Sequence, residues 1–155
     1  KINNGRIVFC CGSCQFLNDL AVDQRPKEEK VKKHPKIKIN NVQFDKALNR
    51  LNLALEIYGV YLFHTVEGVI VNYMPSLFKK KQLSDIGNRL SKSFAEVEAE
   101  RELVQGMSVI FPHSAINAHL VSKDLYLIIG CKTFPLSEQI TTRISKTIQV
   151  LRAIN

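Results

Sequence analysis

The sequence predicts a mixed α+β domain built on a five-stranded antiparallel sheet. The first observation is that apolar residues recur every three or four positions in three segments, as in amphipathic helices: 41–58, 77–100 and 135–154. The second is a set of five short runs of β-branched and aromatic residues: 60–65, 69–73, 107–111, 115–121 and 125–131. Three-residue breaks within the strand groups are too short for parallel crossovers, so these strands are antiparallel.

Length and composition favour one soluble domain of ordinary size. The chain has 155 residues, 45% of them apolar and 23% charged, which suits a single core. Because no stretch approaches the roughly 20 apolar residues of a membrane helix, we expect no membrane span. The chain starts at Lys1 without a methionine, so we expect residues before it.

A division near Asn40 separates a basic segment from the domain. Residues 1–40 carry nine basic and four acidic side chains, which is +5 of the net charge of +8. Few of their side chains could fill a core, and Asn40 or Asn41 can cap the helix that follows. We therefore expect a basic, cysteine-containing N-terminal segment, 1–40, and a folded domain, 41–155.

The first helix and the hairpin follow one another directly. Leu48, Leu51, Leu55 and Tyr58 share one face of a helix that Gly59 is expected to end. The next two runs are joined at 66–68, where Gly68 permits a turn, so they form a hairpin.

The second half of the domain repeats this alternation. A second helix is expected from residue 77 to about 100, with Ser84 as its cap only if the helix begins later. The run 125–131 is apolar on both faces, which places it in the middle of the sheet. Pro135 is expected to open the last helix, with Val150 and Ile154 widening its apolar face.

Three local segments resemble the roadblock/dynein light chain family. Residues 58–63 (Tyr-Gly-Val-Tyr-Leu-Phe) resemble the entry into that family's first strand, and 67–71 its acidic-glycine hairpin turn. Residues 123–128 resemble the turn before its last strand. The element order over 41–155, about three quarters of the chain, is similar as well.

This resemblance implies a protein that performs no chemistry of its own. Such proteins form homodimers or heterodimers and regulate a Ras-like small GTPase or scaffold a larger complex. Their third strands pair and their second helices lie side by side, which carries over to 107–111 and 77–98. The implied interface residues are Met107, Val109, Phe111, Ile86, Leu90 and Phe94.

Physical chemistry alone also favours a covered strand at 107–111. An apolar strand at a sheet edge invites aggregation unless another strand pairs with it. A second copy of the chain could supply that strand, and so could the N-terminal segment.

The second helix carries a basic surface that could bind an acidic partner. Its positive residues lie toward its start, and Glu96, Glu98 and Glu100 lie at its end, opposite to the preference of the helix dipole. Such a surface either contacts a partner or keeps the helix solvated. The candidate partner-binding residues are Lys80, Lys81, Arg89 and Lys92.

The N-terminal cysteines allow a zinc site. Cys11 and Cys14 have the spacing of half a zinc ribbon, and Cys10 and His34 are the nearby further candidates. The alternative function is therefore a metal- or nucleic-acid-binding regulator acting through 1–40, with the domain serving dimerisation. A dithiol redox site is a third possibility. Otherwise reduced thiols indicate a cytoplasmic protein.

Enzymatic use of the remaining residues is not expected. No glycine-rich phosphate loop occurs, so nucleotide would be bound by a partner and not by this chain. His64, His113 and His119 are expected to be structural, and no acid completes a hydrolase triad with Ser114. The main interpretation involves neither nucleic acid nor a cofactor.

Overall fold

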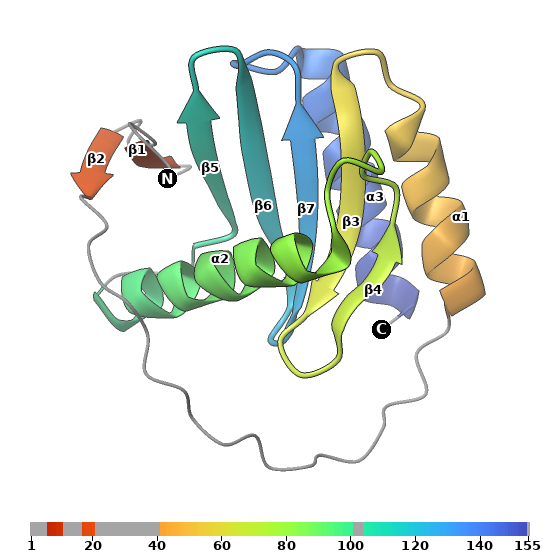
Figure 1. Ribbon diagram of the computed structural model, residues 1–155, viewed down its shortest axis with the longest axis horizontal. Helices are drawn as coiled ribbons and strands as arrows, with labels where there is room; N and C mark the ends of the chain where they lie inside the picture. The colour runs from red at the N-terminus through yellow and green to blue at the C-terminus, as the bar shows by residue number, and fades with distance from the viewer. Residues whose placement is uncertain (1–5, 11–16, 21–40, 101–103, 155) are drawn as a thin grey trace.

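A computed structural model describes residues 6–10, 17–20, 41–100 and 104–154 of the chain. Its centre is one antiparallel sheet, in the order β2-β1-β5-β6-β7-β3-β4. Helix α2 crosses one face of the sheet, and α1 and α3 cover the other (Figure 1). The strands are β1 (Arg6–Cys10), β2 (Leu17–Leu20), β3 (Ile57–His64), β4 (Gly68–Asn72), β5 (Gly106–Phe111), β6 (Ser114–Ser122) and β7 (Leu125–Cys131). The helices are α1 (Asn41–Asn52), α2 (Lys80–Glu100) and α3 (Glu138–Ile154).

The predicted fold class is confirmed. The five predicted strands are β3 to β7, and every pairing between them is antiparallel. All seven residues of β7 are buried, in agreement with its predicted central position. Gly68 has φ of 76°, as the hairpin turn requires.

Helix α1 is shorter than the predicted 41–58. It ends at Asn52, and two tight turns follow, with Ala54 N donating to Leu51 O (3.1 Å) and Ile57 N to Ala54 O (3.0 Å). The chain leaves the helix because Ile57 already pairs with Cys131 of β7. Gly59 therefore lies inside β3 and does not end the helix.

Two apolar residues that were predicted to be helical lie outside the helices and are exposed. Leu55, after α1, is 89% exposed, and Leu77, before α2, is 83% exposed. Helix α2 starts at Lys80, where the Gln82 side chain accepts a hydrogen bond from Lys79 N (2.9 Å). Ser84 lies inside the helix and is not its cap.

Helix α3 begins three residues after Pro135, the predicted first residue. Ser137 caps it, because its Oγ accepts a hydrogen bond from Ile140 N (3.4 Å). The Glu56 carboxylate in turn accepts bonds from Ser137 Oγ (2.6 Å) and N (3.2 Å), which lower the pKa of Glu56. Val150 is 48% exposed, so the prediction that it widens the buried face is wrong.

Two apolar clusters hold the layers together, one on each face of the sheet. Alternate residues of β3 divide between them: Val60 and Leu62 face α1 and α3, and Tyr61 and Phe63 face α2. The helical members of the first cluster include Phe44, Leu48, Leu51, Ile140, Ile144 and Leu151, and those of the second are Leu83, Leu90 and Phe94.

Candidate interaction surfaces

The outward side of α2 presents the basic residues that the sequence singled out. The side chains of all four are exposed, and none forms an ion pair with another described residue. Arg89 and Lys92 are one turn apart, and Lys81 precedes Arg89 by about 12 Å along the axis at 1.5 Å per residue. The four residues are Lys80, Lys81, Arg89 and Lys92.

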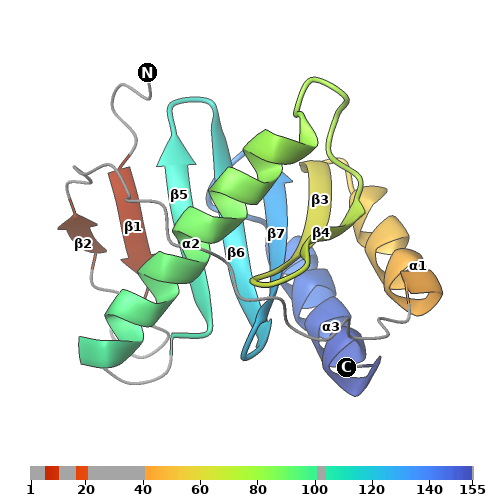
Figure 2. The same ribbon diagram turned by 60° about the horizontal axis from the view of Figure 1, so that its bottom comes forward.

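Helix α2 is fixed to the sheet near its beginning. The hydroxyl of Tyr61 donates a buried hydrogen bond to Leu83 O (3.2 Å). Gly87 lies against the ring of Phe63, so closely that an added Cβ would come within 2.8 Å of ring atom Cδ1. Helix α2, which carries the basic residues, lies across the sheet (Figure 2) and is held there by these contacts.

The predicted interface residues of α2 lie largely inside one chain. Leu90 and Phe94 are buried in the cluster between α2 and the sheet, and Ile86 packs against this cluster while partly exposed. Because the inner side of an amphipathic helix covers its own sheet first, Ile86 is the member of this group that remains accessible.

Strand β5 is not an edge of the sheet in this structure. Its inner side pairs with β6, and its outer side pairs with β1, in the register Arg6↔Ile110, Ile7↔Val109 and Val8↔Ser108. Of the two strands that could cover β5, one from a second copy or one from the N-terminal segment, the structure contains the second. A second chain could pair with β5 only after β1 had left, because a strand has two edges.

The predicted β5 interface residues differ in burial. Met107 is buried against the α2 side, and Val109 packs partly exposed against the same cluster. Phe111, at the end of the strand, is partly exposed. Dimerisation through these residues stays a prediction.

The histidines have structural surroundings. His64 Nδ1 accepts bonds from Val66 N (3.2 Å) and Glu67 N (3.3 Å) and so closes the hairpin turn. His113 is exposed in the turn between β5 and β6. His119 Nε2 is buried without a hydrogen-bond partner in the described part of the chain, and burial lowers the pKa of His119 to about 4.

A polar chain that the sequence did not suggest runs across three strands. Ser108 Oγ donates to Asn117 Oδ1, and Asn117 Nδ2 donates to the thiol of Cys131 (3.1 Å). Burial raises the pKa of Cys131 to about 11, so this thiol is neutral and unreactive at physiological pH. The alternation within β6 could have indicated that Asn117 points inward.

The candidate zinc ligands lie mostly outside the described residues. Cys11, Cys14 and His34 fall there, and Cys10 ends β1. Among the described residues, no three His, Cys, Asp or Glu side chains come together as a metal site would require. Zinc binding by the N-terminal cysteines stays a prediction.

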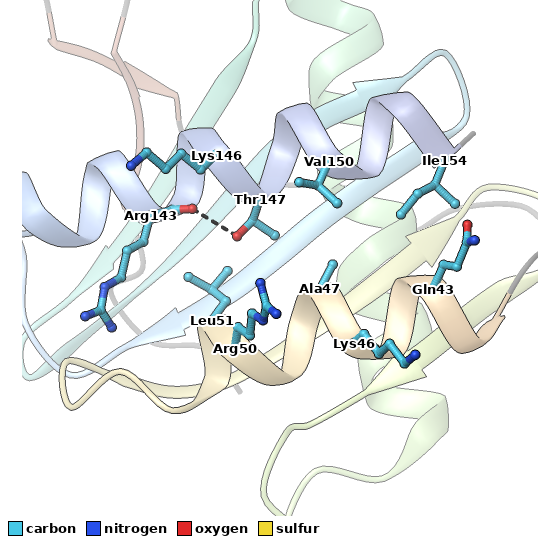
Figure 3. Close-up of a pocket in the computed structure, with 10 residues that line it drawn as sticks. All are labelled: Gln43, Lys46, Ala47, Arg50, Leu51, Arg143, Lys146, Thr147, Val150 and Ile154. Atoms are coloured by element: carbon cyan, nitrogen blue, oxygen red, sulfur yellow. Dashed lines mark hydrogen bonds between the residues drawn. The ribbon is translucent and has the colours of Figure 1, made fainter.

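A groove between α1 and α3 is a second surface, which the sequence did not predict. Its volume is about 660 Å³. The two helices run antiparallel, with Arg50 and Arg143 at one end of the groove and Gln43 and Ile154 at the other (Figure 3). The signal was present as exposed basic residues at helical spacing, in 46–50 and 143–146.

The described helices contain no segment long and apolar enough to cross a bilayer. Comparison by sequence finds no match: no protein-family model matches the chain, and no curated protein does.

Comparison by structure finds roadblock-type folds. MglB from Myxococcus xanthus superimposes with a TM-score of 0.66 at 13% identity, over 78% of this chain and 93% of that one. The gliding protein MglB from Thermus thermophilus gives 0.64 at 9% identity, over 80% and 97%. A Roadblock/LC7 domain from Streptomyces avermitilis gives 0.58 at 9% identity, over 70% and 94%. The fold is therefore roadblock-like, which confirms the resemblance inferred from the sequence.

Proposed function

We propose that this chain is a non-enzymatic regulator or scaffold that binds a Ras-like small GTPase, or a complex containing one, through the outward side of α2. The observation that carries the proposal is the combination of a roadblock-like fold with an exposed basic surface on its longest helix. The resemblance implies the class of partner, and the four cations, which have no ion-pair partner among the described residues, suit an acidic surface on it.

The reactive side chains of the domain support a binding role. Burial raises the pKa of Cys131, so its thiol keeps its proton. The Nδ1 atom of His64 accepts hydrogen bonds from the backbone of the hairpin turn. His119 lies beside Gly106, and burial lowers its pKa to about 4, so its ring is neutral at physiological pH. The proposal accordingly assigns no bond-making step to this chain.

Self-association through β5 belongs to the same proposal, on the condition that β1 first leaves the outer edge of β5. The β1–β5 ladder spans three residue pairs, from Arg6↔Ile110 to Val8↔Ser108. A short ladder is easily exchanged for an equivalent one, so a second copy would replace β1 at the outer edge of β5. Cytoplasmic location follows from the partner class and is part of the proposal.

The test is affinity capture with purified chain from native extract, in the presence of GDP or of a non-hydrolysable GTP analogue. Mass spectrometry of the bound fraction should identify a Ras-like GTPase whose recovery depends on the nucleotide. The variant Arg89→Glu/Lys92→Glu should reduce this recovery at least tenfold.

A matched control separates the α2 surface from overall charge. The variant Lys123→Glu/Lys132→Glu changes the net charge by the same amount at two exposed positions away from α2 and should capture the GTPase normally. Absence of any GTPase under both nucleotides, or equal capture by both variants, would overturn the proposal.

A further inference from the structure

The groove between α1 and α3 is strongly asymmetric in charge. Four of the ten residues that line it are basic, and none is acidic. None of the four forms an ion pair with another described residue. The four cations are Lys46, Arg50, Arg143 and Lys146.

Each of the two helices contributes two of these cations. Lys46 and Arg50 are four residues apart on α1, and Arg143 and Lys146 are three apart on α3, so each pair lies on one side of its helix. Like charges at this spacing destabilise a helix by about 0.2–0.5 kcal/mol for each pair. The groove thus carries four positive charges, and none of them is paired with a carboxylate of the described residues.

Apolar side chains also line the groove. Leu51 is buried at the floor, and Ala47 and Ile154 are partly buried beside it. Val150, which was predicted to widen the apolar face of the last helix, is half exposed on the groove wall. A ligand that fits must therefore bring apolar groups for the floor and negative charges for the rims.

The dimensions suit a short helix. From Arg143 to Ile154 the wall extends about 16 Å at 1.5 Å per residue, which is three helical turns. An amphipathic helix of that length places its apolar residues on one side and acidic residues along both borders.

We propose that the α1–α3 groove binds an acidic amphipathic helix of a partner protein, with its apolar side on Val150, Ala47 and Ile154 and its carboxylates at the four cations. This partner is distinct from the GTPase proposed for α2, because the two surfaces lie on opposite faces of the sheet (Figure 1).

Charge argues against the chain's own N-terminal segment as the occupant. Residues 21–40 carry seven basic and three acidic side chains, the same sign as the groove. A nucleic acid would match the charge, but its bases would find no aromatic ring among the lining residues on which to stack. The apolar floor favours a peptide.

The test uses a synthetic 18-residue helical peptide labelled for fluorescence anisotropy, whose central three turns carry leucines along one side and glutamates along both borders of that side. The full chain should bind it, and ¹⁵N chemical-shift changes should concentrate at 43–51 and 143–154. Arg50→Glu/Arg143→Glu should weaken binding at least tenfold, whereas Lys123→Glu/Lys132→Glu should not.

Other ligands and one further variant test which kind of molecule the groove binds. The same peptide with lysines in place of its glutamates should not bind, and a polyglutamate of equal charge should bind at least tenfold more weakly, because it lacks the apolar side. Val150→Asp should also weaken binding. Equal binding of polyglutamate or of an oligonucleotide would overturn the proposal, and so would shift changes located elsewhere. Unchanged circular dichroism spectra will establish that the exposed substitutions leave the fold intact.

Discussion

The ring of Phe63 in β3 lies directly against the Cα atom of Gly87 in α2. A Cβ at this position would come within 2.8 Å of Cδ1 and nearer still to Cγ and Cδ2. Both residues are buried, and Phe63 is one of the largest fully enclosed side chains of the domain. Only glycine permits this contact, so α2 approaches the sheet more closely here than a helix with any side chain could.

Gly87→Ala should therefore destabilise the domain although alanine favours helices. Crowding in a filled core costs about 1–3 kcal/mol, which exceeds the gain of about 1 kcal/mol from helix propensity. Because the added Cβ would come within 2.8 Å of ring atoms, the cost should lie toward the upper end of this range, and urea denaturation should show a net loss of up to about 2 kcal/mol. The exposed neighbour substitution Asn88→Ala should change stability by less than about 0.5 kcal/mol. A Gly87→Ala chain as stable as the original would show that Phe63 moves freely.

Disrupting β1 should promote self-association. Val8 lies opposite Ser108 of β5 and Asp19 of β2, so Val8→Pro breaks the ladder in the middle of β1. Light scattering after size exclusion should show a larger dimer fraction for Val8→Pro than for the original chain at the same concentration. An identical mass distribution for both chains would mean that β5 is not the associating edge.

His119 should make the domain sensitive to mild acid. Its pKa is lowered from 6.5 to about 4 in the folded chain, so the folded state binds fewer protons than the unfolded state. The contribution to stability is complete above pH 6.5 and is lost as the pH falls toward 4.

Between pH 7.5 and 5 this group should cost roughly 2 kcal/mol of unfolding free energy, from the two pKa values. His119→Leu removes the titrating ring and the unpartnered Nε2, so its stability should fall less over the same interval. Urea denaturation of both chains at the two pH values measures the difference. Parallel losses in the two chains would count against His119 as the source.

Asn117 should be the costliest polar residue of the sheet to remove. It is 3% exposed and accepts from Ser108 while donating to Cys131. Asn117→Ala should cost about 2–3 kcal/mol, because it leaves a cavity and deprives two side chains of their partner. Ser108→Ala removes one of these bonds and should cost about 1 kcal/mol. Chemical denaturation at pH 7 will rank the two, and the reverse order would contradict this account.

Periodicity predicted most of the fold because each helix of 41–155 buries one side, and because the strands are short runs of β-branched and aromatic residues between polar turns. It failed where tertiary pairing overrode a local pattern. Leu55 and Tyr58 continue the helical spacing of α1, yet the ladder between Ile57 and Cys131 draws the chain into β3. Gly59 was expected to end the helix, but it is a residue of β3. A Cβ added at this position would lie 2.7 Å from the Sδ atom of Met74.

The interaction surfaces were predicted less completely than the fold. The cations of α2 are close together in sequence and could be recognised as one group. Those of the groove belong to α1 and α3, about 90 residues apart, and only their packing brings Arg50 near Arg143. The covering of β5 by β1 also depends on a distant contact, so the sequence could state it only as one of two alternatives.

The sheet separates the surface of α2 from the groove between α1 and α3. With a helical layer on each side, ligands on the two faces stand roughly 20 Å apart, well beyond the Debye length of about 8 Å at physiological salt. Charge brought to one face is screened from the other, so neither ligand should weaken the other's binding. A GTPase and an acidic helix could therefore occupy the chain together, which would make this small domain the bridge of a ternary complex.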